Sequence, residues 1–328
     1  MTAYPEGART LSDKELVMTD RQRASHRYAG MAGKYFQRHG DQAAEDRARD
    51  DIGRLLEGWR VAMWDRDGVM SRLDGSALRI DELRVPALPK AERSPETKED
   101  ALSYISSAQR ADFAIGTYHN LMRGLDAMLL NDARTDLRLH LSSPYVHIRA
   151  LIEAATTALW LLGPTSSDVR VTNALWLRHE ELEFSRRLAE RYAKLSNDAD
   201  ADDAKREQVK FVNGQLADLQ KITTNAGLSH KAVEKPLSPS FIAAEGGVFA
   251  PKAGKAITYW YWSTASSIAH GEPNNTNMLG DMKLLGVDHR DEPVAHVEPS
   301  TVNVWNHLNV ANELITQAHE LWNRRARP

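Results

Sequence analysis

Cysteine is absent from the 328 residues, and this absence excludes disulfide bonds, thiolate nucleophiles and zinc sites built on sulfur. A long hydrophobic run is also missing, because the most apolar segment, ALIEAATTALWLLG, contains Glu153 and is too short to cross a bilayer. The first residues, MTAYPEGARTLSDKE, carry charges where a signal peptide needs an apolar stretch. The sequence therefore predicts a cytoplasmic protein that does not enter a membrane.

A strong charge of one sign is lacking too. The formal net charge is -3 and the isoelectric point is near 6.5, which argues against coating nucleic acid by bulk electrostatics but leaves room for a local basic groove. The sequence has no Walker A motif, dinucleotide fingerprint, GxSxG elbow or HExxH motif. Asp50-Asp51 lacks the third carboxylate that magnesium-dependent terpene synthases require. We therefore expect no metal ion and no cofactor.

What the chain does contain is 42% hydrophobic and 27% charged residues, enough for a core and a well-solvated surface. Apolar positions recur with a period near 3.6, which indicates helices. The predicted helices span residues 20–38, 43–64, 100–131, 144–162, 168–195, 203–226, 255–270 and 301–325. The predicted fold class is all-α, an antiparallel helical bundle of about five or six long helices with an N-terminal helical extension.

The predicted domain organisation follows from a change in composition. Residues 1–95 form a charged N-terminal helical extension and residues 96–328 the bundle domain, joined at the proline-broken segment PALPKAERSPETKED. Turn residues and the alternating run ALRIDELRV predict a small hairpin within residues 67–90. Residues 228–252 contain no clear period and are predicted to form a long irregular loop.

Charged residues interrupt the most apolar predicted helix. Arg149 and Glu153 are four residues apart, so their side chains can pair on one face of the helix. Apolar neighbours place the pair in a partly buried setting, where a charge needs a partner. The pair is therefore either an internal structural ion pair or part of a site. Arg178, in the next helix, either faces Glu153 or belongs to a solvated, salt-bridged face.

The most specific signal is the segment ITYWYWSTASSIAHGEPNN. Hydroxyl groups and an imidazole share one face of this helix, Gly271 supplies the left-handed residue that ends it, and the dipole at a helix end favours cationic His270. The alternative is a C-capping histidine beside a polar turn. The polar residues in question are Tyr259, Ser263, Ser266, Ser267 and His270, followed by Asn274 and Asn275.

Three segments together resemble a known family. They are RALIEAATTALWLL, the arginine-rich RVTNALWLRHEELEFSRRLAE and the helix end YWSTASSIAHG. Over about residues 145–275 this combination resembles uncharacterised actinobacterial HEPN-like proteins. HEPN domains are helical bundles that often dimerise, and many are metal-independent ribonucleases with an Arg-x(4–6)-His motif. Others have lost catalysis and serve as binding or regulatory modules.

The resemblance implies an arginine that stabilises a pentacovalent phosphate and a histidine that transfers protons. At the family spacing before His270 this chain has Ser263, Thr264 and Ala265. An arginine would therefore have to come from another helix, and Arg149 and Arg178 are the candidates. The candidate catalytic residues are His270, Arg149 and Arg178; the candidate binding residues are Glu153, Ser263, Ser267, Asn274, Asn275 and Tyr259.

Three functional hypotheses follow. The leading one is a HEPN-like homodimer that binds RNA or a nucleotide in stress or phage defence, as a metal-independent endoribonuclease or a degenerate form of one. The second is a non-catalytic interaction or regulatory scaffold that binds a protein partner through its N-terminal helices. The third is a small-molecule pocket lined by the aromatic residues Tyr259, Trp260, Trp262 and Trp160.

Overall fold

The computed structural model describes residues 42–64, 72–86, 88–95, 105–131, 136–196, 200–272, 280–287 and 293–328. Ala48–Pro328 form one compact unit, and the other unit, Met1–Arg47, lies almost entirely outside these ranges. The helix predicted over residues 20–38 is outside the described residues as well. The predicted boundary between residues 95 and 96 stays a prediction, and so does the extension that it defines.

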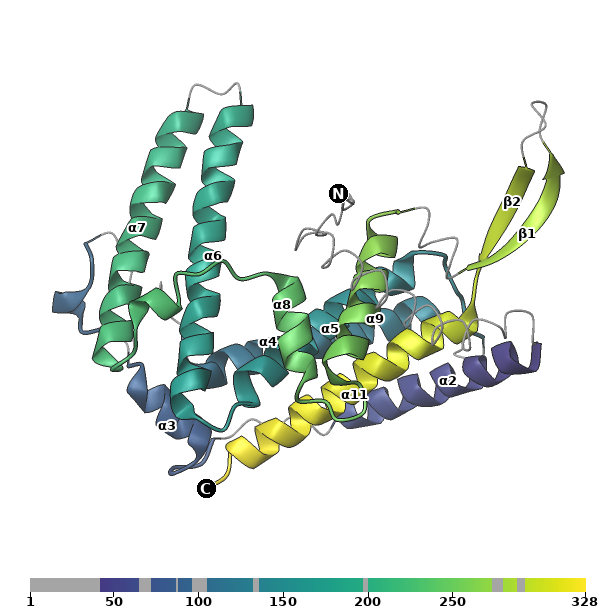
Figure 1. The fold of residues 1–328 in the computed structure, drawn as a ribbon, viewed down its shortest axis with the longest axis horizontal. Coiled ribbons are helices and arrows are strands. Elements are labelled where there is room, and N and C mark those ends of the chain that lie inside the picture. The colour runs from purple at the N-terminus through teal and green to yellow at the C-terminus, as the bar shows by residue number, and fades with distance from the viewer. Residues whose placement is uncertain are drawn as a thin grey trace, which may run out of the picture. The chain divides into compact units, whose positions relative to one another are not determined.

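The described residues form nine α-helices, six of which have 20 or more residues (Figure 1). The helical-bundle fold class is therefore confirmed. Two short 3₁₀ turns lie between helices: η2 (Lys90–Glu92) between α3 and α4, and η3 (His230–Ala232) between α7 and α8. The α-helices are α2 (Gln42–Trp64), α3 (Ala77–Arg84), α4 (Ser107–Leu129), α5 (Ser143–Leu162), α6 (Ser167–Leu195), α7 (Ala201–Asn225), α8 (Pro239–Gly247), α9 (Gly254–Ala269) and α11 (Thr301–Arg325).

Serine residues determine where several of these helices begin. Ser106 forms a capping box with Gln109 at the start of α4, and each side chain satisfies a backbone N–H of the first turn. Ser76 and Ser300 cap α3 and α11 in the simpler way, by accepting from a backbone N–H three residues on. The predicted and observed boundaries of α2, α5, α6, α7, α9 and α11 agree within two residues. Helix α4 begins at Ser107, seven residues later than predicted, because Ser106 caps it.

Helix α5 is the central element. It packs against α4, α6, α8, α9 and α11, and its buried residues include Ile148, Leu151 and Ile152. Helix α2 lies beside α11 (Figure 1), where the Trp59 indole donates to the Asn312 side chain at 2.8 Å. Helices α4, α5 and α11 thus form a packed layer that fixes the positions of the shorter helices α8 and α9.

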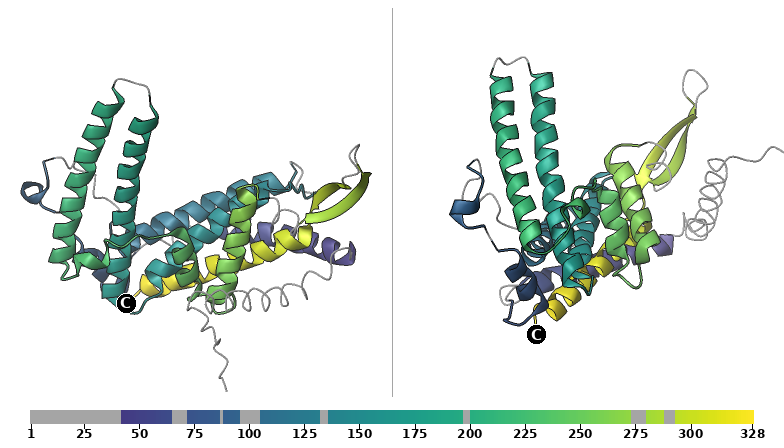
Figure 2. Two further views of the ribbon diagram at one scale, coloured as in Figure 1. Left: turned by 45° about the horizontal axis from the view of Figure 1, so that its top comes forward. Right: turned by 60° about the vertical axis from the view of Figure 1, so that its left-hand side comes forward.

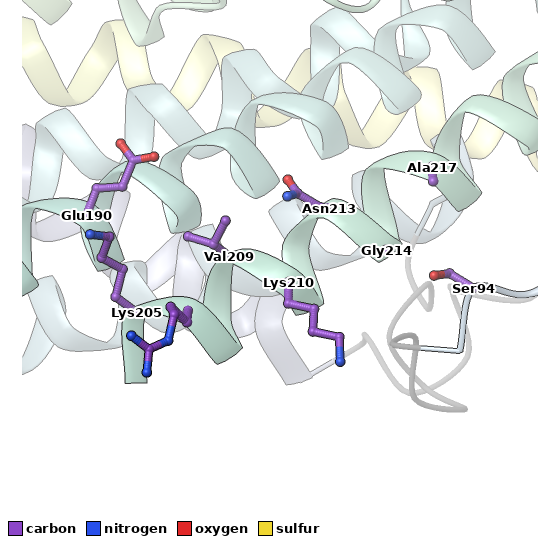
Figure 3. A pocket seen from close by; sticks show the side chains of 9 residues that line it. Ser94, Glu190, Lys205, Val209, Lys210, Asn213, Gly214 and Ala217 are labelled. Atoms are coloured by element: carbon purple, nitrogen blue, oxygen red, sulfur yellow. The ribbon is translucent and has the colours of Figure 1, made fainter. Parts of the chain in front are cut away.

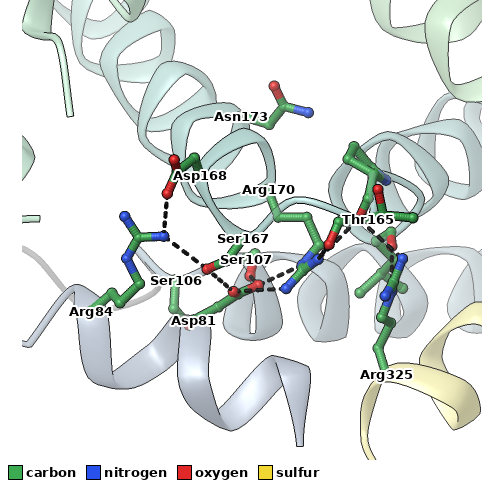
Figure 4. A network of polar contacts seen from close by, with 12 residues as sticks. Asp81, Arg84, Ser106, Ser107, Thr165, Ser167, Asp168, Arg170, Asn173 and Arg325 are labelled. Carbon is green, nitrogen blue, oxygen red and sulfur yellow. Dashed lines mark hydrogen bonds and ion pairs between the residues drawn. The ribbon is translucent and has the colours of Figure 1, made fainter. Parts of the chain in front are cut away.

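A buried polar network joins α3 to the bundle (Figure 4). The Asp81 carboxylate is fully buried and accepts two hydrogen bonds from Arg170, at 2.7 and 2.9 Å. It also accepts from the hydroxyls of Ser107 and Ser167, at 2.9 and 2.6 Å. Arg325 donates to the carbonyl groups of Leu162, Gly163 and Pro164 at the C-terminal end of α5. Residues from α3, α4, α6 and α11 are therefore held around the α5–α6 turn.

Helices α6 and α7 form an antiparallel hairpin whose far end extends beyond the other helices (Figures 1 and 2). Its base is packed into an apolar cluster that includes Leu182 of α6 and Val212 of α7. We call the part beyond these two residues, Glu183–Leu195 and Ala201–Phe211, the arm. The arm is held mainly by contacts between its own two helices.

Three segments differ from the sequence expectation. The hairpin predicted within residues 67–90 is wrong, because Ser76 caps a helix, α3, that buries Leu78 and Asp81 on one face. Residues 228–252 are not wholly irregular, since Ser238 and Pro239 start the short helix α8. An unpredicted antiparallel hairpin is formed by β1 (Gly280–Val287) and β2 (Pro293–Pro299), whose register shifts between Leu284 and Gly286.

None of the helices in the described ranges combines the length and apolar character that a membrane crossing needs.

Candidate functional site

Arg149, Glu153 and His270 meet at one point. Arg149 and Glu153 lie on consecutive turns of α5, and the Arg149 Nε donates to Glu153 Oε1 at 2.9 Å. Arg149 Nη1 lies 2.9 Å from Nε2 of His270, the residue that ends α9. Gly271 follows with a φ of 73°, which lets the chain leave the helix in the left-handed conformation. The three residues and Trp262 are referred to as the His270 cluster.

Trp262 completes this cluster, although the sequence predicted it only as part of an aromatic pocket and not beside Arg149 and His270. Its indole N–H donates to Glu153 Oε1 at 2.8 Å, the same oxygen that accepts from Arg149. The Arg149 guanidinium carbon lies 6.0 Å from the centre of the Trp262 ring. Glu153 therefore holds both the cation and the indole. Its position in the sequence could have indicated this role, because Trp262 lies about two helical turns before His270 and so on the same side of α9.

The Arg149–His270 hydrogen bond determines which ring nitrogen of His270 carries the proton. A guanidinium can only donate, so Nε2 must be the acceptor and the neutral ring carries its proton on Nδ1. His270 presents an unprotonated nitrogen to a neighbouring cation, which is the form that a general base needs.

The cluster is open to solvent. The Arg149 side chain is 25% exposed and the Glu153 side chain 32%, and His270 is an exposed residue. A purely structural ion pair in a core would be sealed from water and would have its remaining polar atoms satisfied by the protein. The observed exposure leaves Arg149 and His270 accessible to a ligand of some size.

The other predicted binding residues are arranged less closely. Tyr259 is exposed and its ring centre lies 6.1 Å from that of Trp262, so it borders the cluster. Ser263 and Ser267 are half-buried on α9, and within the described ranges no hydrogen bond joins either hydroxyl to Arg149, Glu153 or His270. Asn274 and Asn275 lie outside the described residues.

Arg178 is not a member of the His270 cluster. It lines a neighbouring cavity of about 810 Å³ between α4, α5, α6 and α7, and Glu153 lies on the wall of the same cavity. Arg178 Nη2 donates to Gln215 Oε1 at 2.9 Å, and its Nη1 lies 3.3 Å from Glu181. Arg110 donates to both oxygens of Glu181, at 2.6 and 2.8 Å.

These contacts shift the pKa values of Arg178 and Glu181, which both line the cavity. Burial lowers the pKa of Arg178, the like charge of Arg110 lowers it further, and Glu181 opposes both effects. Burial alone would raise the pKa of Glu181, but hydrogen bonds and charge from Arg110 and Arg178 bring it below its usual value. Glu181 thus stays ionised between two guanidinium groups. In this arrangement Arg178 joins α6 to α7 and does not reach His270.

A second, shallower cavity of about 560 Å³ runs along α7 (Figure 3). Its lining includes the basic residues Lys205, Arg206 and Lys210. Ser94 lies at the end of this surface away from Lys205. No residue of the His270 cluster reaches this surface. The basic groups of α7 therefore form a separate feature and contribute nothing to the candidate site.

The aromatic residues of the third hypothesis do not line one pocket. Trp160 is buried, and its ring packs edge-on against Trp176 while also meeting Phe241. Tyr259 lies instead beside Trp262 at the surface. The aromatic pocket is therefore wrong as predicted, because α5 directs Trp160 toward α6 and α8.

Within the described ranges, no three side chains from His, Asp and Glu gather as a metal site would require. Comparison with protein-family models, with curated proteins and with solved structures finds no match to this chain. The geometry of the His270 cluster is therefore the basis on which a function can be argued.

Proposed function

We propose that this protein binds RNA at the His270 cluster through a backbone phosphate and cleaves the bound strand without a metal ion. The observation that supports the proposal is the 2.9 Å hydrogen bond from Arg149 to Nε2 of an exposed histidine. It places a fixed cation and an unprotonated imidazole nitrogen side by side. Cleavage of a phosphodiester by its neighbouring 2′-hydroxyl uses both groups. The cation stabilises the negative charge on the phosphate, and the imidazole nitrogen accepts the proton of the hydroxyl.

The chemistry would proceed in one displacement. The phosphate draws the Arg149 guanidinium to its oxygens, which releases His270 Nε2 from its hydrogen bond. His270 then takes the proton of the 2′-hydroxyl, whose oxygen attacks the adjacent phosphorus. The bond from phosphorus to the 5′-oxygen breaks, and that oxygen takes a proton from the imidazolium or from water. The products are a 2′,3′-cyclic phosphate and a 5′-hydroxyl end, with no net oxidation or reduction.

The rest of the cluster supports these two groups. Glu153 orients Arg149 through its Nε, which leaves the outer nitrogens of the guanidinium for the phosphate. Tyr259 and Trp262 offer exposed and half-exposed aromatic faces on which an unpaired base can stack. The HEPN-like relationship, a homodimeric state, a cytoplasmic location and a role in defence belong to this proposal. In it, Arg149 on α5 replaces the arginine that HEPN nucleases carry near the histidine.

The test compares His270→Ala and Arg149→Ala with His140→Ala, an exposed histidine that takes no part in the cluster. Each protein is mixed with a labelled single-stranded RNA in excess EDTA, and binding and cleavage are measured separately. We expect His270→Ala to retain binding within a few fold and to lose cleavage by about 100-fold or more. We expect Arg149→Ala to weaken both, whereas His140→Ala should behave like the parent.

Two results would reject the proposal. One is RNA cleavage or binding by a folded His270→Ala, Arg149→Ala double variant at the level of the parent protein. The other is a parent protein that neither binds nor cleaves RNA, together with a lower melting temperature for His270→Ala. The second result would favour the non-catalytic scaffold, in which the cluster only fixes the positions of α5 and α9.

A further inference from the structure

Helix α6 carries a row of exposed apolar side chains on its arm. Phe184, Leu188, Tyr192 and Leu195 are 60%, 56%, 55% and 78% exposed. At roughly 100 Å² of free surface for each such side chain, the row forms a patch of about 400 Å², close to the largest that single-chain proteins usually leave uncovered. Burial of this area would stabilise a complex, so the row is a candidate contact surface.

The spacing of the row suits another helix. The four residues are separated by four, four and three positions, so they form one ridge along a straight α-helix. Such a ridge fits the groove between the side chains of a second helix. Aliphatic Leu188 and Leu195 alternate with the aromatic rings, whereas a surface for stacking bases would use the rings and cations alone.

One edge of the row is basic. Arg187, Arg191 and Lys194 are exposed and lie on the same side of the ridge. Arg187 pairs with Glu180 of its own helix. No acidic side chain of the arm pairs with Arg191 or Lys194 in the described ranges, so this edge keeps an excess of positive charge. A partner helix with carboxylates along the matching edge would form ion pairs with these basic side chains.

The same charges disfavour a second copy of this chain on the ridge. Two copies that paired antiparallel about Leu188 would place Arg187 of one copy beside Arg191 of the other on one edge. Like charges at such positions are destabilising, and the pair would occur twice because of the two-fold symmetry.

Ser185, which follows Phe184 at the foot of the ridge, lines the cavity of about 810 Å³ described above. Leu177, Phe113 and Phe211 form apolar parts of its wall. A partner helix lying along the ridge could therefore insert a bulky apolar side chain at this end, in the way that anchor residues fill pockets at interfaces.

From these observations we propose that the α6 face of the arm, Phe184–Leu188–Tyr192–Leu195, docks an acidic amphipathic helix of another protein. This activity is separate from RNA cleavage at the His270 cluster. The arm would act as a fixed platform whose ridge supplies contact area and whose basic edge sets the orientation and partner choice.

The test uses two labelled synthetic peptides, each about 20 residues and so nearly six turns long. Both carry leucines at helical a and d positions, and they differ only in having glutamate or lysine at the flanking positions. Fluorescence anisotropy with the full chain at low salt should show the glutamate peptide binding about tenfold or more tightly than the lysine peptide. Leu188→Glu should remove this binding, and Arg191→Glu with Lys194→Glu should reverse the preference.

A matched control is available in Leu83→Glu, because Leu83 of α3 is 65% exposed and lies off the arm. It should bind the glutamate peptide like the parent, and so should His270→Ala. Equal binding of the two peptides, no binding of either, or binding that survives Leu188→Glu would refute the proposal. So would sedimentation of the parent as a dimer that Leu188→Glu dissociates, or single-stranded RNA binding that Tyr192→Ala removes.

Discussion

Two histidines of the bundle differ in what surrounds their ring nitrogens. His270 reaches Arg149 at an exposed helix end, whereas His307 of α11 is fully enclosed by α5, α9 and α11. His307 Nδ1 lies 2.8 Å from the Asn303 carbonyl oxygen and its Nε2 lies 3.0 Å from the Thr264 hydroxyl. A neutral ring satisfies both contacts by donating through Nδ1 and accepting through Nε2. Burial accordingly lowers the pKa of His307 to about 4, although the bond to Asn303 opposes the shift.

This buried histidine predicts how stability depends on pH. Between pH 6.5 and about 4 the unfolded chain binds a proton at His307 that the folded protein does not, so stability falls as pH decreases through this range. The difference amounts to about 2 kcal/mol of unfolding free energy between pH 7 and pH 5. Urea unfolding of the parent and of His307→Gln at both pH values measures it. The variant should lose less stability on acidification.

The control is His140→Gln, because His140 is exposed and lies outside the buried core that encloses His307. It should keep the acid sensitivity of the parent. An unchanged pH slope in His307→Gln would show that other groups cause the loss of stability.

Sequence reasoning singled out Arg149, Glu153 and His270 because each carries a local signal, although the contact between Arg149 and His270 joins residues far apart in the chain. The first two are one helical turn apart, and a histidine before glycine marks a helix end. It offered Arg178 as an alternative to Arg149, because helical spacing gives a residue's face but not the helix opposite it. Arg178 instead meets Gln215 of α7 and Glu181, contacts that depend on how α6 and α7 pair.

Among the elements, α8 packs closely through two glycines, of which Gly246 faces α5. A Cβ added to Gly246 would overlap the Thr156 carbonyl oxygen of α5, which the backbone cannot easily move away from. We expect Gly246→Ala to lower the unfolding free energy by about 2 kcal/mol or more, because α8 would have to separate from α5. Thermal and urea unfolding measure the change.

Gly53 of α2 provides the matched substitution. Nothing lies within 4 Å of a Cβ at that position, so alanine should gain about 0.5–1 kcal/mol from its better helix propensity. Equal effects of the two substitutions would contradict the close packing of α8 on α5. The sequence gives no sign of this packing, since a glycine pair in an irregular stretch first suggests a loop.

For the whole molecule, the Asp81 network bears on the predicted boundary at residue 95. A chain that starts at residue 96 lacks α2 and α3 and therefore lacks the carboxylate that pairs with Arg170, whose side chain is 3% exposed. A buried charge without its partner costs about 3–5 kcal/mol. We expect residues 96–328 to unfold without a cooperative transition in calorimetry.

Residues 42–328 retain both helices and should melt like the full chain. The Asp81→Ala variant of the full chain removes the carboxylate but keeps α2. We expect its stability to lie between that of residues 42–328 and that of residues 96–328. A cooperative transition of residues 96–328 at the melting temperature of the full chain would support the predicted boundary and contradict this account.

Trp262 has one further consequence for experiments on this protein. Its indole shares the Glu153 oxygen with Arg149 and lies under the guanidinium, so any anion that attracts Arg149 also changes the surroundings of the indole. Tryptophan emission responds to neighbouring charge and hydrogen bonding. The chain has eight tryptophans, and a Trp262→Phe variant supplies the difference signal. The cluster therefore contains its own optical probe, which can follow ligand arrival in real time without an attached dye.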